Sequence, residues 1–445
     1  MPAKLKLTNS LRLLKASKRI IPCATQTLSK GYTQWSVGAS PLFLERAKGC
    51  MVTDVDGNQY IDYGMGLGPF LLGYSDAEVN RAVREQLKKG TMFTLPHPLE
   101  IEAAELIIKH VPSAEMVRFG KNGSDATTAA VKLARAHTGR DSIIACGYHG
   151  WHDWYIASTE RNAGIPKIIK SLILSVRYND LAGLHELIAR HKGKIAGLIM
   201  EPVYTIAPNP GYLQAVRELT RKEGIVLIFD EMFSGFRWSL GGAQEYFKVT
   251  PDLSCFGKAI ANGFPISVIT GRRDIMQRFE EVFFSFAYGG ETLSLSAVVA
   301  TIHKLKEKKV HAHVWRLGEI LKAGIESLIT KHGIAEFVSI IGYPVKSAFN
   351  FNGAKGVSAL EMKTYFQQEC ATRGILFIGY HLPSYAHKET HIRKTLEVYD
   401  AVMRQFRKEM EQGTLKKRLK GSVITQIFKN VGDRSGGVAL NEPVA

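Results

Sequence analysis

With 445 residues, the chain is long enough to bury a large core and to form two packed units. Its contents of 45% hydrophobic and 22% charged residues are typical of a globular protein, and no run of 18 apolar residues predicts a transmembrane helix. The formal charge of +17 fits nucleic acid, an anionic surface or small anionic ligands. Because no motif combines basic with aromatic residues, small ligands are favoured, and neither nucleic-acid nor membrane binding is expected.

The five cysteines are scattered along the chain without a C-x-x-C pair. This spacing indicates neither a disulfide framework nor a metal site, and it fits a reducing cytoplasm. The basic stretch at residues 5–21 lacks the uninterrupted apolar core of a secretory signal. An organelle transit peptide has a similar pattern, but a surface helix packed on a domain is favoured. A cytoplasmic location is therefore expected.

The first elements along the chain are a hairpin and two helices. The pattern at residues 54–60 predicts the hairpin, with Asp56-Gly57 as its tight turn. Ser75 is expected to cap the helix that follows, and a second helix is predicted at 98–110.

Short apolar runs then alternate with helical segments up to about residue 308. Such runs suit a sheet that is buried on both faces, and the alternation predicts an α/β unit with a mostly parallel sheet. We therefore place a large domain at residues 75–308. Its predicted strands are Met116–Phe119, Ser142–Cys146, Ala196–Met200, Ile225–Phe229 and Ile266–Thr270.

The remaining residues mix helices and strands, which predicts a smaller α+β domain at 309–445. The N-terminal segment, residues 1–74, is expected to join it. The tail after Gly421 is short and is expected to be poorly ordered. The predicted helices are 314–331, 359–373 and 388–412, and the predicted strands are 337–341 and 348–351.

Several polar residues follow the predicted strands, at the edge where open α/β sheets bind ligands. Gly123 and Ser124 lie in a small turn that opens a helix, which suits a phosphate. Tyr148 follows the next strand and is placed to stack on a flat heterocycle. Asp230 ends a buried strand, so its carboxylate needs a partner such as a protonated pyridine nitrogen. Each feature alone is better explained as a helix cap, loop packing or an ion pair.

Lys258 lies in the block 250–265, between small and apolar residues. An amine that forms a Schiff base needs access and a lowered pKa, which burial beside other positive groups provides. Thr292 follows a glycine-rich stretch and offers another hydroxyl to a phosphate. A single lysine is usually a surface charge, and such a turn is usually a cap, so the argument rests on these residues occurring together.

In this order and spacing the residues resemble the class III aminotransferases, which use pyridoxal phosphate (PLP), and above all their glutamate-1-semialdehyde aminomutase branch. The likeness runs from about residue 20 to residue 396 and includes the blocks 230–237 and 250–265. It implies the PLP-dependent transferase fold type I, an α/β fold with a large domain around a mostly parallel sheet and a smaller α+β domain.

The resemblance also implies roles for single residues. Lys258 is the residue expected to hold the cofactor and move the proton, and Asp230 is expected to bind the pyridine nitrogen. Thr292 is expected to reach the phosphate of a partner subunit, which predicts a homodimer. Glu201 also matches the family, with its role left open. The matching cofactor-binding residues are Gly123, Ser124, Tyr148, Asp230, Lys258 and Thr292.

The sequence departs from the aminomutase at two places. Tyr32 occupies the position of the family's substrate-carboxylate arginine, and the stretch 377–383 has no glutamate where the family has a gating glutamate. Loss of a bidentate arginine contact disfavours a small carboxylate-bearing semialdehyde. A bulkier, hydroxylated acceptor held by Trp151, Tyr380 and His381 is therefore predicted.

Residues 240–246 resemble relatives in sugar and surface-polysaccharide pathways. The leading prediction is thus an aminotransferase for a carbonyl acceptor, with a sugar or polyol derivative as the acceptor. One alternative is a true glutamate-1-semialdehyde 2,1-aminomutase, which moves the amino group within one molecule. Another is a regulatory or structural protein with the PLP fold, although intact Lys258 and Asp230 oppose it.

Overall fold

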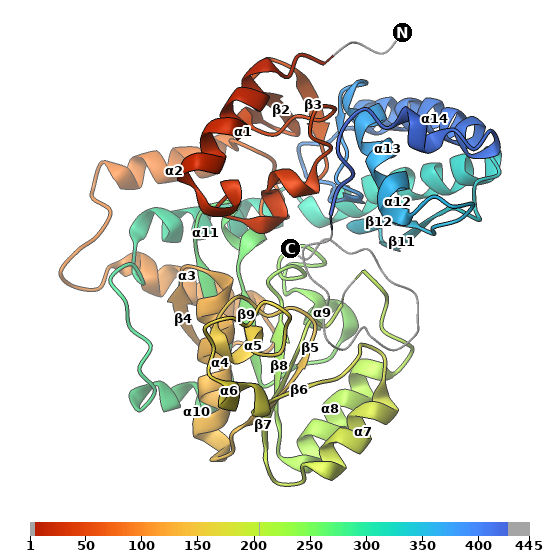
Figure 1. Ribbon diagram of the computed structural model, residues 1–445. Helices are drawn as coiled ribbons and strands as arrows, with labels where there is room; N and C mark the ends of the chain where they lie inside the picture. Colours follow the sequence, from red (N-terminus) through yellow and green to blue (C-terminus); the bar gives the residue numbers. More distant parts are fainter. Residues whose placement is uncertain (1–4, 204, 426–445) are drawn as a thin grey trace.

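The computed structural model describes residues 5–203 and 205–425, and Figure 1 shows their elements in two groups. The lower group surrounds a large sheet, and the upper group joins the N-terminal and C-terminal segments. The tail predicted to be poorly ordered falls mostly on residues 426–445, outside the described part. Among the described helices, none is both long and apolar enough to cross a membrane.

The large sheet contains seven strands, β4 (Met116–Gly120), β5 (Ser142–Cys146), β6 (Ile173–Ser175), β7 (Ile195–Met200), β8 (Val226–Asp230), β9 (Leu253–Phe256) and β10 (Ser267–Gly271). Their order is β4-β10-β9-β8-β7-β5-β6, and only the two pairs that involve β10 are antiparallel. Every residue of β5, β7, β8, β9 and β10 is buried, as expected for strands covered on both faces. The predicted α/β fold with a mostly parallel sheet is confirmed.

Helices pack on both faces of this sheet. One face is covered by α4 (Gly123–Thr138), whose alanines allow close packing against the strands, and the other by α7 (Leu181–Arg190) and α8 (Tyr212–Glu223). The alternation of helix and strand brings the carboxyl ends of β5, β7 and β8 to one edge. The other helices of this group are α5 (Asp153–Ile156), α6 (Lys167–Ser171), α9 (Ala243–Phe247), α10 (Arg273–Met276) and α11 (Thr292–Glu307).

The N-terminal elements are α1 (Thr8–Ile20), β1 (Leu44–Lys48), β2 (Met51–Asp54), β3 (Gln59–Asp62), α2 (Ala77–Leu87) and α3 (Pro98–His110). The C-terminal elements are α12 (Val310–Lys331), β11 (Val338–Tyr343), β12 (Lys346–Phe351), α13 (Ala359–Ala371), β13 (Ile375–Leu376), β14 (Tyr380–His381) and α14 (Glu389–Glu411). Two small sheets, β1-β2-β3-β13 and β11-β12-β14, organise this group.

Strand β3 pairs in parallel with β13, so the N-terminal segment shares a sheet with the C-terminal part of the chain. The predicted hairpin is present as β2 and β3, and Gly57 in its turn has a φ of +89°. The domain boundaries near residues 74 and 308 stay predictions.

Two predicted helix starts need correction. Asp76, not Ser75, caps α2, because its carboxylate accepts the N–H groups of Glu78 and Val79. Ser75 has a φ of +52° and donates its hydroxyl to the carbonyl of Ala47 instead. Helix α4 begins at Gly123, so Gly123 and Ser124 lie inside the first helical turn and not in a turn that precedes the helix.

Candidate active site

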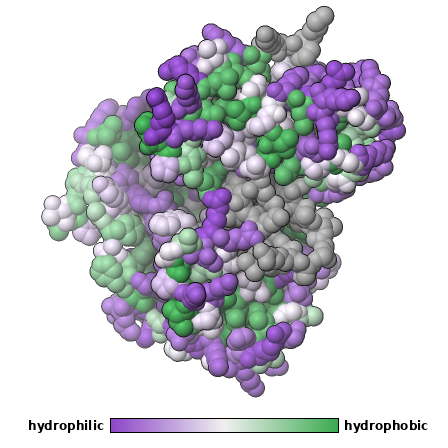
Figure 2. Space-filling model, in the orientation of Figure 1, coloured by the Kyte–Doolittle hydropathy of each residue, from purple (hydrophilic) through white to green (hydrophobic). Residues whose placement is uncertain are grey.

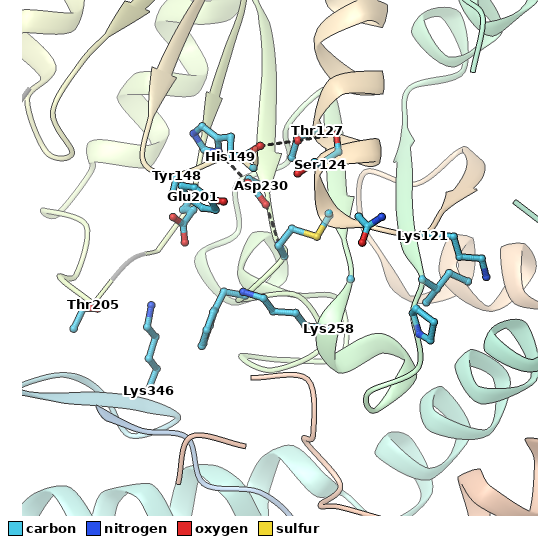
Figure 3. Close-up of a pocket in the computed structure, with 18 of the residues that line it drawn as sticks. Lys121, Ser124, Thr127, Tyr148, His149, Glu201, Thr205, Asp230, Lys258 and Lys346 are labelled. Atoms are coloured by element: carbon cyan, nitrogen blue, oxygen red, sulfur yellow. Dashed lines mark hydrogen bonds and ion pairs between the residues drawn. The ribbon is translucent and has the colours of Figure 1, made fainter. Parts of the chain in front are cut away.

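A cavity of about 350 Å³ lies at the carboxyl ends of β5, β7 and β8 (Figure 3). Five of the six residues predicted to bind the cofactor line it, and Thr292 does not. Its walls also include residues from the C-terminal group, Lys346, Ala348 and Tyr380. The residues of the predicted set that line the cavity are Gly123, Ser124, Tyr148, Asp230 and Lys258.

The amino-terminal end of α4 forms one wall of the cavity. The carboxylate of Asp125 accepts the N–H groups of Lys121 and Asn122, which fixes the turn before the helix. The N–H groups of Gly123 and Ser124 belong to the first turn, where an α-helix leaves donors unsatisfied and the helix dipole is positive. This end of α4 therefore suits a phosphate, as the sequence predicted.

The loop after β5 packs directly on this turn. The hydroxyl of Ser124 accepts the N–H of Trp151 at 3.1 Å. Gly150 has a φ of +106°, and a Cβ atom at this position would lie 2.3 Å from the hydroxyl oxygen of Ser124. A glycine is thus required for the close approach of the two segments.

Asp230, at the end of β8, forms a buried pair with His149. The Nδ1 atom of His149 lies 2.8 Å from Oδ2 of Asp230, and their side chains are 0% and 4% exposed. The other carboxylate oxygen of Asp230 accepts the N–H of Met232 at 3.1 Å. Within the described part of the chain, Nε2 of His149 has no hydrogen-bond partner. Sequence reasoning missed His149, although it directly follows Tyr148.

Lys258 begins a short 3-10 helix immediately after β9. Its φ of +47° lies in the left-handed region, which costs a non-glycine residue about 1–2 kcal/mol and persists only where the surroundings enforce it. The ammonium nitrogen lies 4.5 Å from the ring centroid of Phe233. Burial lowers the pKa of Lys258 because it disfavours the charged amine, and the negative charge of Glu201 opposes this shift. A larger fraction of neutral, nucleophilic amine results.

Two further ionisable residues of the cavity were not assigned from the sequence. Glu201 follows β7, and burial raises the pKa of its carboxyl group while Lys346 lowers it. Lys346 begins β12, and its Nζ lies 4.2 Å from the centroid of the Phe233 ring. The strand-end Glu201 was noticed without a role. Nothing in the sequence around Lys346 indicates that a hairpin of the C-terminal group carries it to this cavity.

Thr292 is fully buried and lies outside the cavity of its own chain. Its hydroxyl lies 3.0 Å from the carbonyl oxygen of Gly90 and 3.1 Å from that of Thr91. The neighbouring Glu291 pairs with Lys121, at the edge of the cavity, with an N–O distance of 3.0 Å. The role of Thr292 toward a partner subunit stays a prediction.

Of the residues expected to hold the substrate, only Tyr380 lines this cavity. His381 is fully buried, and its Nε2 is bonded to the hydroxyl of Tyr399 at 2.7 Å. Successive side chains point to opposite faces of a strand, so in β14 Tyr380 faces the cavity and His381 faces the core. Trp151 is 67% exposed, and Tyr32 lines a separate groove beside the N-terminal segment.

The side chains of this cavity fit PLP. A helix terminus with small residues suits the phosphate, and the carboxylate of Asp230 suits a protonated pyridine nitrogen. Tyr148 offers an aromatic face, and Lys258 offers an amine with a lowered pKa. All four groups line one cavity of about 350 Å³, so one compact heterocycle satisfies them together.

Comparisons with known proteins agree with this chemistry. The chain is 34% identical over 418 residues to a 3-aminobutyryl-CoA aminotransferase of Cloacimonas acidaminovorans (strain Evry), covering 92% of this chain and 100% of that protein. It is 36% identical over 394 residues to a glutamate-1-semialdehyde 2,1-aminomutase of Methanothermobacter thermautotrophicus, covering 82% of this chain and 92% of that protein.

Solved structures share the whole fold. The PLP internal aldimine form of the FumI protein from Sphingopyxis sp. MTA144 matches with a TM-score of 0.84 and 26% identity, over 94% of this chain and 99% of that chain. An omega-transaminase from Sphaerobacter thermophilus matches with a TM-score of 0.81 and 25% identity, over 89% and 98%. The family model described as aminotransferase class-III matches residues 32–406. The chain therefore belongs to the class III aminotransferases and is a PLP-dependent enzyme of that family.

Proposed function

We propose that this enzyme transfers an amino group from a small-molecule donor to a separate carbonyl acceptor, with Lys258 and Asp230 as its catalytic residues. The observation that carries the proposal is their shared cavity. An amine with a lowered pKa and a buried carboxylate held by His149 line the same space. PLP, when bound, supplies an electron sink for the substrate carbons.

Each side chain has a separate task in this proposal. Lys258 attaches the cofactor and then takes and returns the proton at the substrate carbon. Asp230 keeps the pyridine nitrogen protonated, and His149 holds the carboxylate in place. Gly123 and Ser124 bind the phosphate through the amino-terminal end of α4.

The identity of the acceptor is the second part of the proposal. The two relatives named above bear the names of a coenzyme A ester and of glutamate-1-semialdehyde, and neither name supports the predicted sugar or polyol, which stays a prediction. The second candidate function is the intramolecular aminomutase, favoured by the relative at 36% identity. Transfer between two molecules is preferred because the stretch 377–383 contains no glutamate and presents Tyr380 to the cavity.

The test compares the wild-type enzyme with Lys258→Ala in single-turnover reactions. Purified holoenzyme is mixed with a panel of amino donors, and conversion to the pyridoxamine form is followed by absorbance. We expect Lys258→Ala to bind PLP through its phosphate and ring but to lose conversion by orders of magnitude. Normal conversion by Lys258→Ala contradicts the assignment. Glutamate-1-semialdehyde is then supplied alone, and efficient formation of 5-aminolevulinate would favour the aminomutase.

A homodimer in the cytoplasm is proposed as the working state. Exposed apolar side chains support the dimer, because large apolar surfaces usually mark contacts with another chain. These side chains lie on α2, on α3 with the segment before it, and on the loop before α11, which are all on the left of Figure 1. Figure 2 shows the molecule in the same orientation, coloured by hydropathy. The exposed side chains are Leu87, Met92, Phe93, Leu95, Ile101, Ile108, Phe283, Phe286 and Tyr288.

The cytoplasmic location rests on the free cysteines, Cys23, Cys50, Cys146, Cys255 and Cys370.

A further inference from the structure

Lys346 is a cation of the cavity wall to which neither the family resemblance nor the proposed chemistry gives a task. It lies at the start of β12, beyond the tight turn that joins β11 and β12. We propose that Lys346 is a specificity-determining residue that binds the carboxylate of an amino acid donor. This inference rests on the proposed transfer of an amino group, since it concerns the substrate that supplies that group.

The position of Lys346 relative to Lys258 supports this role. Their ammonium nitrogens lie 4.2 Å and 4.5 Å from the centroid of the same Phe233 ring, so both belong to one end of the cavity. Figure 3 shows Lys346 and Thr205 to the left of Lys258, and Ser124 of the predicted phosphate turn above it. Lys346 is therefore placed toward the substrate side and away from the predicted phosphate site.

The charge balance at this end favours an anion. Lys346 and Lys258 place two amines against the same Phe233 ring, and the positive charge of Lys346 disfavours the charged form of Lys258. Glu201 is the carboxylate that faces both, but burial raises its pKa and reduces the negative charge that it carries near neutral pH. A substrate carboxylate bound beside Lys346 would bring a negative charge to this group of two amines and form a charge-assisted contact.

The surroundings of Lys346 can hold such a group. Thr205 is buried and lines the same end of the cavity, and Tyr380 lines it from β14. A hydroxyl and a phenol are suitable second donors to a carboxylate that Lys346 holds as a point charge. Because the donor must also bring its amino group to Lys258, the amine and the carboxylate must be separated by only a few bonds. The chemical class is therefore a short α-amino or β-amino acid.

The test uses donors that differ only where a carboxylate replaces a methyl group. L-Alanine is compared with isopropylamine, and 3-aminobutanoate with 2-aminobutane, in single-turnover reactions of the holoenzyme. Lys346→Met should lower kcat/KM for the preferred amino acid by about ten- to hundred-fold, the range of one charge-assisted hydrogen bond, and should change its matched amine by less than about threefold. Lys346→Arg should restore most of the activity because it keeps a cation at the same place.

Two controls separate this role from a structural one. Lys355→Met removes one positive charge from an exposed site just beyond β12, where Lys355 pairs with Glu336, and should leave both donor classes unchanged. Binding of propanoate, which has a carboxylate and no amine, is followed through the cofactor absorbance and should weaken in Lys346→Met but not in Lys355→Met. The affinity of the apoenzyme for PLP should be the same in all variants.

Several results would overturn the inference. Equal losses for amino acids and amines in Lys346→Met would show that the residue tunes the cavity without reading the carboxylate. Unchanged kinetics of Lys346→Met would show that Lys346 has no role in donor binding. A wild-type enzyme that accepts the amines but neither amino acid would also contradict the inference. A wild-type enzyme that converts no donor of any class would instead contradict the proposed function itself, so the two failures are distinguishable.

Discussion

The pair formed by His149 and Asp230 gives the sharpest prediction about catalysis. His149→Ala removes a hydrogen bond to the carboxylate of Asp230 and leaves the one from the N–H of Met232. Both side chains of the pair are buried, so water cannot easily replace the lost donor. Asp230 would then carry its negative charge at a greater free-energy cost and hold a protonated ring nitrogen less firmly.

The expected magnitude follows from that single bond. A hydrogen bond to a charged group contributes about 1.5–3 kcal/mol, which corresponds to about a ten- to hundred-fold slower half-reaction. His149→Asn provides the matched variant, because its amide N–H reaches the position of Nδ1 and should recover part of the rate. Asp230→Asn should be slower than either, since it removes the carboxylate itself.

The assay is stopped-flow absorbance of the conversion to the pyridoxamine form, with each variant saturated with PLP. Circular dichroism and cofactor content establish that the variants are folded and loaded. If fully loaded His149→Ala reacts within about twofold of the wild-type rate, the pair does not support catalysis. If His149→Asn is as slow as His149→Ala, the hydrogen bond is not the reason for the loss.

Three further predictions concern the cofactor, acid stability and assembly. Gly150→Ala places a Cβ atom 2.3 Å from the hydroxyl oxygen of Ser124, so the dissociation constant of PLP should rise by about tenfold or more in titrations of the apoenzyme, and an unchanged constant would contradict the phosphate assignment. Hydrogen bonds from Arg217 hold the pKa of Asp252 below its usual value of 3.8, although burial opposes them. This carboxylate therefore stabilises the fold above about pH 4 and loses that contribution as the pH falls through its lowered pKa. In urea unfolding, Asp252→Asn should lower the free energy of unfolding by about 3–5 kcal/mol at pH 7, and this loss should shrink in acid. A loss that does not depend on pH would refute the prediction. Sedimentation of the holoenzyme at low concentration should show a dimer, as expected if Thr292 serves a neighbour, and a fully active monomer would contradict this.

Local pattern predicted most of the large sheet. The strand Ser142–Cys146 has the same bounds in the sequence prediction and in the structure, because five consecutive residues are buried between two layers of helices. Strand β9 was not predicted as a separate element. It is only four residues long, and it contains Ser254, whose hydroxyl is bonded to that of Ser113 at 2.9 Å inside the core. A polar residue satisfied by a distant partner gives no apolar signal in the sequence.

The residues of the site divide in the same way. Asp230, Lys258 and Gly123 line the cavity, and they could be predicted from the sequence because each stands in a local block that matches a family pattern. His149 and Lys346 were not, because their roles depend on contacts across the fold. His149 meets a carboxylate 81 residues away, and Lys346 reaches the cavity only because β12 lies beside it. No local window of the sequence contains both partners of either contact.

The glycines of the site have a packing role besides the role in phosphate binding that the motif predicts. Gly123 was taken as the start of a phosphate turn, yet a Cβ atom there would lie 3.0 Å from the sulfur of Met232. Gly257, next to Lys258, meets the same sulfur, and its Cβ atom would lie at 2.8 Å. Met232 therefore packs between the phosphate turn and the lysine turn, and both approach it closely because neither has a side chain. Larger residues would push the two turns apart, so packing around one methionine sets how near the predicted phosphate site lies to the amine of Lys258.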